Sequence, residues 1–153
     1  MSTLWKKEGA GTDVDILAFT IGEDRVLDNR LIPYDIIGSL AHVKGLAKIG
    51  LMSDRETTNL TAALSTLHQK WHAGEFALGP EDEDVHSAIE RCLTEALGET
   101  GKKIHTGRSR NDQVLTALRL FMKAELLKAM EELAAIIQST CKSGNQYQQV
   151  LMP

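Results

Sequence analysis

The sequence predicts an all-α protein, and three observations support this prediction. Aromatic residues make up only 5% of the 153 residues, and there are only three prolines. Apolar residues recur every three to four positions over several long segments, which is the period of an amphipathic helix. No segment shows the strict alternation of apolar and polar residues that is typical of a half-buried strand.

The first expected helix opens at Pro33, because the first turn of a helix tolerates proline. It follows a glycine-containing entry, "KKEGAGTD", and an apolar segment, "VDILAFTIG". Gly50 is a natural end for this helix. Five apolar residues suit one buried face by their spacing: Ile37, Leu40, Ala41, Leu46 and Ile49.

Two further helices are expected before residue 98. Ser53 and Glu56 have the spacing of a capping box, which predicts a helix start. Behind them, apolar residues recur at helical spacing until "AGEFALG" interrupts the pattern: Leu60, Leu64, Leu67 and Trp71. The next helix is expected from about Asp84 to Leu97, with apolar residues four positions apart.

The last expected helix begins at Arg110 and is unusually long and apolar. Roughly thirty residues would extend about 45 Å, which exceeds the roughly 26 Å diameter of a small domain. Such a helix requires partners on several sides, so either the chain oligomerises through it or more polypeptide normally follows. The sequence ends within a pattern, at "QQVLMP", and we expect it to be truncated. We therefore expect an N-terminal helical domain over 1–107 and the start of a central long-helix domain over 108–153.

Composition and charge exclude several classes of protein. The net charge of −4 argues against binding to nucleic acid or to an anionic membrane. No apolar run could span a bilayer, and the N-terminus lacks the apolar core of a signal peptide. Cys92 and Cys141 fit a reduced thiol pair at least as well as a disulfide, and they lack the spacing of metal ligands. The simplest compartment is the cytoplasm.

Charged and polar side chains concentrate in "HTGRSRNDQV", immediately before the long helix. Arg108 and Arg110 oppose the positive end of the helix dipole, at about 0.3–1 kcal/mol each when exposed, so they require a compensating anion. One possibility is a carboxylate or phosphate, held by helix N–H groups, the guanidinium groups, Ser109 and Asn111. The other is ion pairing with the acidic block in 79–90. Chemistry alone leaves these two interpretations about even.

The histidines of the predicted helices favour structural roles. His42 lies on an apolar-periodic helix and is expected to be packed and hydrogen-bonded rather than catalytic. His68 and His72 lie four positions apart beside Trp71, but they have no nearby third ligand. We expect both histidines to lie on an exposed helix face, and we expect no metal site.

The motif "GKKIHTGRSRNDQV" closely resembles the signature of argininosuccinate lyases, which are members of the fumarase/aspartase superfamily. The segments "EDEDVHSAIE" and "YDIIGSLAHVKGLAKIGL" resemble two further parts of that family, in the same order and spacing. The opening "LWKK" is similar to the family's start as well. The resemblance covers nearly the whole chain, and the core "TGRSRND" is very specific.

The resemblance implies β-elimination of L-argininosuccinate to L-arginine and fumarate, a step of arginine biosynthesis and of the urea cycle, with no metal or organic cofactor. By position, Ser109, Arg110 and Asn111 would hold the succinyl carboxylates. Thr106 and Arg108 would order the same loop or support it. The small-molecule substrate would be the main partner, together with other copies of the chain in a homotetramer whose central bundle includes the long helix.

Other positions carry weaker expectations from the resemblance. Asp84 and His86 match positions near the family's site, but a capped, hydrogen-bonded helix start explains them nearly as well. Asp24 stands where the family has a substrate-binding serine, and it could instead face the arginine half of the substrate. The family's catalytic histidine and serine segments should lie beyond Pro153. We therefore expect no catalytic residue within this chain, and no activity from it alone.

Three alternatives stay open. The chain could be a structural protein of the same fold, since the family includes lens crystallins, or it could be a non-catalytic helical fragment. Another lyase of the superfamily, acting on adenylosuccinate or fumarate, is the remaining enzymatic alternative, although those enzymes lack the motif "TGRSRNDQV".

Overall fold

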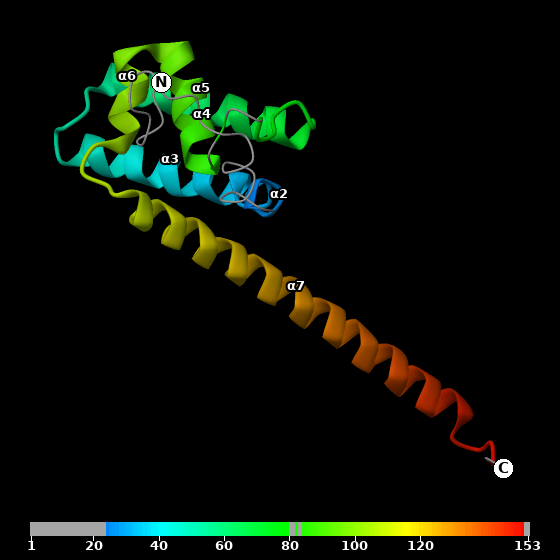
Figure 1. Ribbon diagram of the computed structural model, residues 1–153. Coiled ribbons are helices and arrows are strands. Elements are labelled where there is room, and N and C mark those ends of the chain that lie inside the picture. The colour runs from blue at the N-terminus through cyan, green and yellow to red at the C-terminus, as the bar shows by residue number, and fades with distance from the viewer. Residues whose placement is uncertain (1–23, 80–81, 83, 152–153) are drawn as a thin grey trace. The chain divides into compact units, whose positions relative to one another are not determined.

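The computed structural model describes residues 24–79, 82 and 84–151, apart from the side chains of residues 24 and 25 (Figure 1). Every regular element in this part of the chain is helical, which confirms the predicted all-α class. The elements are α2 (Asp24–Asp28), α3 (Ile32–Lys48), α4 (Asp54–His72), α5 (Val85–Leu97), α6 (Glu99–Lys102), the 3-10 helix η1 (Lys103–His105) and α7 (Arg110–Tyr147). The segments "KKEGAGTD" and "VDILAFTIG" lie outside the described residues.

The chain divides into two compact units, one ending at Leu118 and one beginning at Arg119. In the first unit, α3, α4 and α5 pack against one another, and η1 contacts α3 (Figure 1). Their buried apolar side chains form one core: Ile32, Ile36, Val43, Leu46, Met52, Leu60, Leu64, Leu67, Val85, Ile89, Leu93 and Ile104. The expected domain boundary between residues 107 and 108 remains a prediction.

The buried face of α3 differs from the predicted one. Gly50 follows the helix at φ 79°, as expected for a helix end. Ile37 and Ile49, however, are 46% and 68% exposed, and Ala41 is exposed as well. The buried residues of α3 are Ile32, Pro33, Asp35, Ile36, Ser39, Val43 and Leu46. The prediction was right for Leu46, which is buried, and for Leu40, which packs against the core, but it was wrong for the three exposed residues. It followed apolar residues alone, whereas the true stripe contains two polar residues.

Helices α4 and α5 agree closely with the predictions. Ser53 and Glu56 form the reciprocal bonds of a capping box at the start of α4. The apolar residues predicted to face inward, Leu60, Leu64 and Leu67, are buried, and Trp71 is half-buried. Helix α5 begins directly after Asp84, whose Oδ1 accepts a hydrogen bond of 2.8 Å from the Ser87 backbone N–H.

Helix α7 extends over 38 residues, longer than the roughly thirty predicted from its apolar period. It begins at Arg110, as predicted, and continues through Gly144. Its large apolar side chains are exposed at Leu118, Met122, Leu126, Leu127, Met130, Leu133, Ile136 and Ile137. None of the helices described is long and apolar enough to cross a membrane.

Candidate functional site

Ser109 caps α7 through reciprocal hydrogen bonds with Asp112. The Ser109 hydroxyl accepts from the Asp112 N–H at 3.3 Å, and Asp112 Oδ2 accepts from the Ser109 N–H at 3.0 Å. The backbone N–H of Ser109, followed by its hydroxyl, lowers the pKa of Asp112. This negative charge in the first turn stabilises the helix dipole. Sequence analysis missed the cap, although the spacing Ser-x-x-Asp resembles that of a capping box.

Arg110 binds the start of α5. Its Nη1 lies 3.0 Å from Asp84 Oδ2, and its Nη2 donates a hydrogen bond to the Ser87 hydroxyl. Asp84 therefore has two roles, because its other oxygen caps α5. The predicted ion pair between the arginine motif and the acidic block is thus present for Arg110.

Arg108 has a different environment and is half-buried. Its Nη2 donates to the Ser39 hydroxyl at 3.2 Å and to the Ile104 carbonyl at 3.4 Å. Its Nε is buried without a hydrogen-bond partner in the described part of the chain. Burial lowers the pKa of Arg108, while the nearby negative charge of Asp35 raises it. Within the described part of the acidic block no residue forms an ion pair with Arg108, whose two hydrogen bonds go to neutral oxygens, although the negative charge of Glu90 also raises its pKa.

His86 lies inside the protein beside Asp35. The His86 Nδ1 is 3.1 Å from Asp35 Oδ1, and the two side chains are 4% and 2% exposed. Nδ1 is not aligned for a hydrogen bond, and among the described residues Asp35 Oδ2 has no partner. The structure therefore places His86 in a buried polar cluster with a carboxylate that sequence analysis did not single out.

Thr106 and Asn111 flank the capped turn and are both exposed. The Thr106 carbonyl accepts a hydrogen bond of 3.0 Å from His42 Nε2, which agrees with a packed, hydrogen-bonded His42. The pKa of His42 is lowered, mainly because the ring is partly buried. The Asn111 side chain makes no hydrogen bond within the described part of the chain, so its amide is available to a ligand. Asp24 begins α2, but its side chain lies outside the described residues.

The other predicted histidines lie on α4. The rings of His68 and His72 are in edge contact, with centroids 4.7 Å apart, and both contact Trp71. His72 is exposed as expected, whereas His68 is half-buried by its neighbours. No group of three potential metal ligands occurs among the residues that could be searched.

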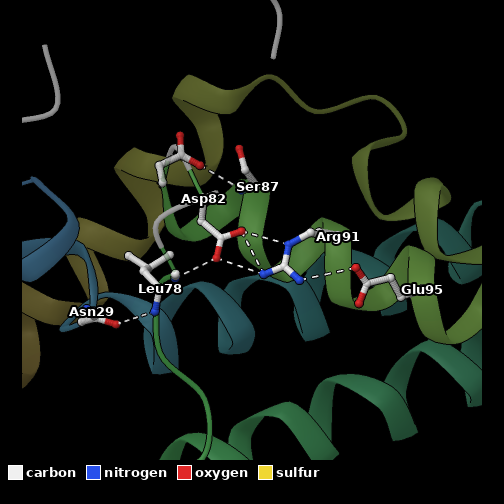
Figure 2. A network of polar contacts seen from close by, with 8 residues as sticks. Asn29, Leu78, Asp82, Ser87, Arg91 and Glu95 are labelled. Carbon is white, nitrogen blue, oxygen red and sulfur yellow. Dashed lines mark hydrogen bonds and ion pairs between the residues drawn. The ribbon is translucent and has the colours of Figure 1, made fainter. Parts of the chain in front are cut away.

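A second polar network holds the segment that leads to Asp84 (Figure 2). Asp82 is 2% exposed and binds Arg91 at both carboxylate oxygens, each at 3.0 Å. Asp82 Oδ2 also accepts from the Gly79 N–H, and the Leu78 N–H donates to Asn29 Oδ1. The acidic block therefore contains a carboxylate, Asp82, that forms a buried ion pair with Arg91. Its partner is nine residues away, which no helical or strand period indicates.

The arrangement suits a small carboxylate. The exposed first turn of α7 presents the Asn111 amide at the positive end of the helix dipole, while the Ser109 hydroxyl donates to Asp112 Oδ2 at 3.0 Å. Arg110 supplies a partly exposed guanidinium beside them. These groups are hydrogen-bond donors, and none of them is a strong base.

Comparisons with known proteins agree with the motif. A family model described as "Lyase" matches residues 11–153. The chain is 48% identical over 137 residues to the argininosuccinate lyase of Thermotoga neapolitana, which covers 90% of the chain and 34% of that enzyme. It is 43% identical over 150 residues to the argininosuccinate lyase of Phocaeicola vulgatus, covering 98% of the chain and 33% of that enzyme. The chain thus spans about a third of the length of these relatives.

Proposed function

The chain belongs to the lyase family of the fumarase/aspartase superfamily, and from this premise we propose that it is the N-terminal part of an argininosuccinate lyase. The proposed reaction is β-elimination of L-argininosuccinate to L-arginine and fumarate. The chain is similar over nearly its whole length to relatives named argininosuccinate lyase, and their name supplies the proposed substrate.

The reaction requires a base, an acid and stabilisation of negative charge. The base removes a proton from the carbon beside a carboxylate, and the electron pair is held as an aci-carboxylate. The bond from the neighbouring carbon to the guanidinium nitrogen then breaks, and the acid protonates the departing nitrogen. Because charge accumulates on one carboxylate, fixed donors aimed at it lower the barrier most.

We assign carboxylate binding to Ser109, Arg110 and Asn111. The observation that carries this assignment is the unbonded, exposed amide of Asn111 beside the Ser109 cap. The ion pair with Asp84 fixes the position of Arg110, and its partly exposed positive charge acts on the ligand from there. Asp84, His86, Thr106 and Arg108 support the loop from behind, and Asp24 is proposed to face the arginine half of the substrate.

We further propose that these 153 residues do not catalyse the reaction alone. General acid and base groups are typically worth about 10²–10⁴-fold each, and the resemblance implies that the family's histidine and serine segments for these roles lie outside these residues. The exposed apolar residues of α7 support assembly with further copies. The homotetramer and the cytoplasmic location are proposed from the family resemblance alone. No metal or organic cofactor is part of the proposed reaction.

Two assays test the proposal. In a complete enzyme carrying these residues, Asn111→Ala should lower kcat by at least about a hundredfold without loss of folding, as removal of a transition-state donor does. Asn59→Ala, an exposed asparagine on α4, is the matched control and should leave kcat unchanged. Wild-type turnover in Asn111→Ala would contradict the assignment.

The second assay follows fumarate release by ultraviolet absorbance. The purified chain should release none, and activity should appear only when the remaining part of a homologous lyase is added. Turnover by the chain alone would overturn our placement of the acid and base, whereas activity on mixing would support a shared active site.

A further inference from the structure

Asp35 is a buried carboxylate to which the proposed function gives no role. It lies in the first turn of α3, is 2% exposed, and has one oxygen with no partner among the described residues. A buried charge is costly unless other charges or donors compensate it. The charged and polar side chains around Asp35 therefore indicate its role.

The first such group is Arg108. Its Nη2 binds the Ser39 hydroxyl, and Ser39 follows Asp35 by four residues on the same buried face of α3. The guanidinium thus lies over the face of α3 that carries the carboxylate. No ion pair joins the two side chains directly: Arg108 Nε and Asp35 Oδ2 are both buried without a hydrogen-bond partner among the described residues, and the negative charge of Asp35 acts on Arg108 from nearby.

The second group is His86, whose Nδ1 is 3.1 Å from Asp35 Oδ1. His86 is in the first turn of α5, between the two residues that bind Arg110. Those residues are Asp84, which forms the ion pair, and Ser87, whose hydroxyl accepts a hydrogen bond. One carboxylate on α3 therefore contacts the turn that holds Arg110 and lies near the guanidinium of Arg108.

We propose that Asp35 is a positioning residue that fixes the loop 106–109 and the first turn of α7. Through Arg108 and His86 it keeps this turn in the conformation that presents Ser109 and Asn111 to a carboxylate. The identity of the ligand rests on the proposed function, but the ordering of the loop does not.

Hydrogen exchange of the 153-residue chain tests the positioning. The informative amides are those of Arg108, bonded to the His105 carbonyl, and Gln113, bonded to the Ser109 carbonyl. In Asp35→Asn both should exchange about tenfold faster, while the core amides of α4 stay protected. Asp54→Asn removes an exposed first-turn acid from α4 and is the matched control, which should leave both amides unchanged. Unchanged exchange in Asp35→Asn, or equal acceleration of the core amides, would overturn the proposal.

A second variant keeps the test decisive if Asp35→Asn does not fold. Ser39→Ala removes the hydroxyl that receives Arg108, and it should also accelerate exchange at the Arg108 amide. Wild-type exchange in this variant would contradict the proposed linkage.

Fumarate titration, followed by the side-chain amide resonances of Asn111, separates this proposal from the proposed function. Weaker fumarate binding in Asp35→Asn than in Asp54→Asn supports both. If fumarate leaves Asn111 unperturbed in the wild type while Asp35→Asn still loosens the loop, the positioning role stands and the carboxylate assignment fails. If fumarate binds Asp35→Asn as tightly as the wild type, Asp35 does not position the site.

Discussion

Replacing Arg91 with alanine should destabilise the first unit more than any other loss of a surface cation. Arg91 donates through Nε and Nη2 to the two oxygens of Asp82, each at 3.0 Å, and these bonds raise the pKa of Arg91 (Figure 2). Asp82 is 2% exposed, whereas the Arg91 side chain is 32% exposed. The substitution would remove the cation that binds the buried Asp82 carboxylate, while the Gly79 N–H would still donate to it.

The magnitude follows from this burial. Removing one partner of a buried ion pair costs about 3–5 kcal/mol, because the other charge is left uncompensated. Arg91 is near one-third exposed, so water screens part of the interaction. We therefore expect a loss of about 2–3 kcal/mol in the free energy of unfolding, which is a large fraction of the ~5–15 kcal/mol typical of a domain.

Urea unfolding followed by circular dichroism measures this loss. Glu95→Gln removes the other, exposed partner of Arg91 and should cost at most about 1 kcal/mol. Combining Asp82→Asn with Arg91→Ala should restore part of the stability, because no charge then remains buried. A loss below about 1 kcal/mol for Arg91→Ala, or equal losses for Arg91→Ala and Glu95→Gln, would refute the reasoning.

Three further predictions follow from other parts of the chain. Gly101→Ala should destabilise the first unit by about 1–3 kcal/mol in thermal melts, since a Cβ would lie 2.3 Å from the Leu93 carbonyl oxygen. Gly45 has open space around it, so Gly45→Ala should instead stabilise the first unit by about 0.5–1 kcal/mol. The Lys103 hydrogen bond lowers the pKa of Glu56 from 4.5 to about 2. The stability that ionised Glu56 contributes is therefore present above pH 4.5 and is lost as the pH falls toward 2. Glu56→Gln should remove that pH dependence of the urea midpoint, and an unchanged profile would contradict it. Light scattering should show self-association through the exposed apolar residues of α7, and Leu126→Glu should weaken it; a monomeric wild-type chain would contradict this.

The helices could be predicted because their signals are local. The capping box at Ser53, the apolar spacing of α4 and the glycine after α3 each depend on residues within a few positions of one another. The error in the buried face of α3 has the same origin. Ser39 and Asp35 are buried because they meet side chains from distant segments, and no property of α3 alone indicates that.

The candidate site could be located from the sequence, but its internal contacts could not. The opposition of Arg108 and Arg110 to the helix dipole indicated that both need partners. Those partners are Ser39, 69 residues from Arg108, and Ser87, 23 residues from Arg110, together with Asp84. Pairings at such separations are set by how α3, α5 and α7 pack, which a helical period does not encode.

The contacts of the two arginines divide the motif into a scaffold and a binding surface. Arg108 is committed to the interior and Arg110 largely to the first turn of α5, so both order the turn before they can act on a ligand. Ser109 is partly committed as well, because its hydroxyl caps α7. Asn111 is exposed, and its side chain makes no hydrogen bond within the described residues. Arg108→Ala should therefore lower stability first and turnover as a consequence, whereas Asn111→Ala should lower turnover at unchanged stability. Equal losses of stability in both variants would show that the motif is a structural junction throughout.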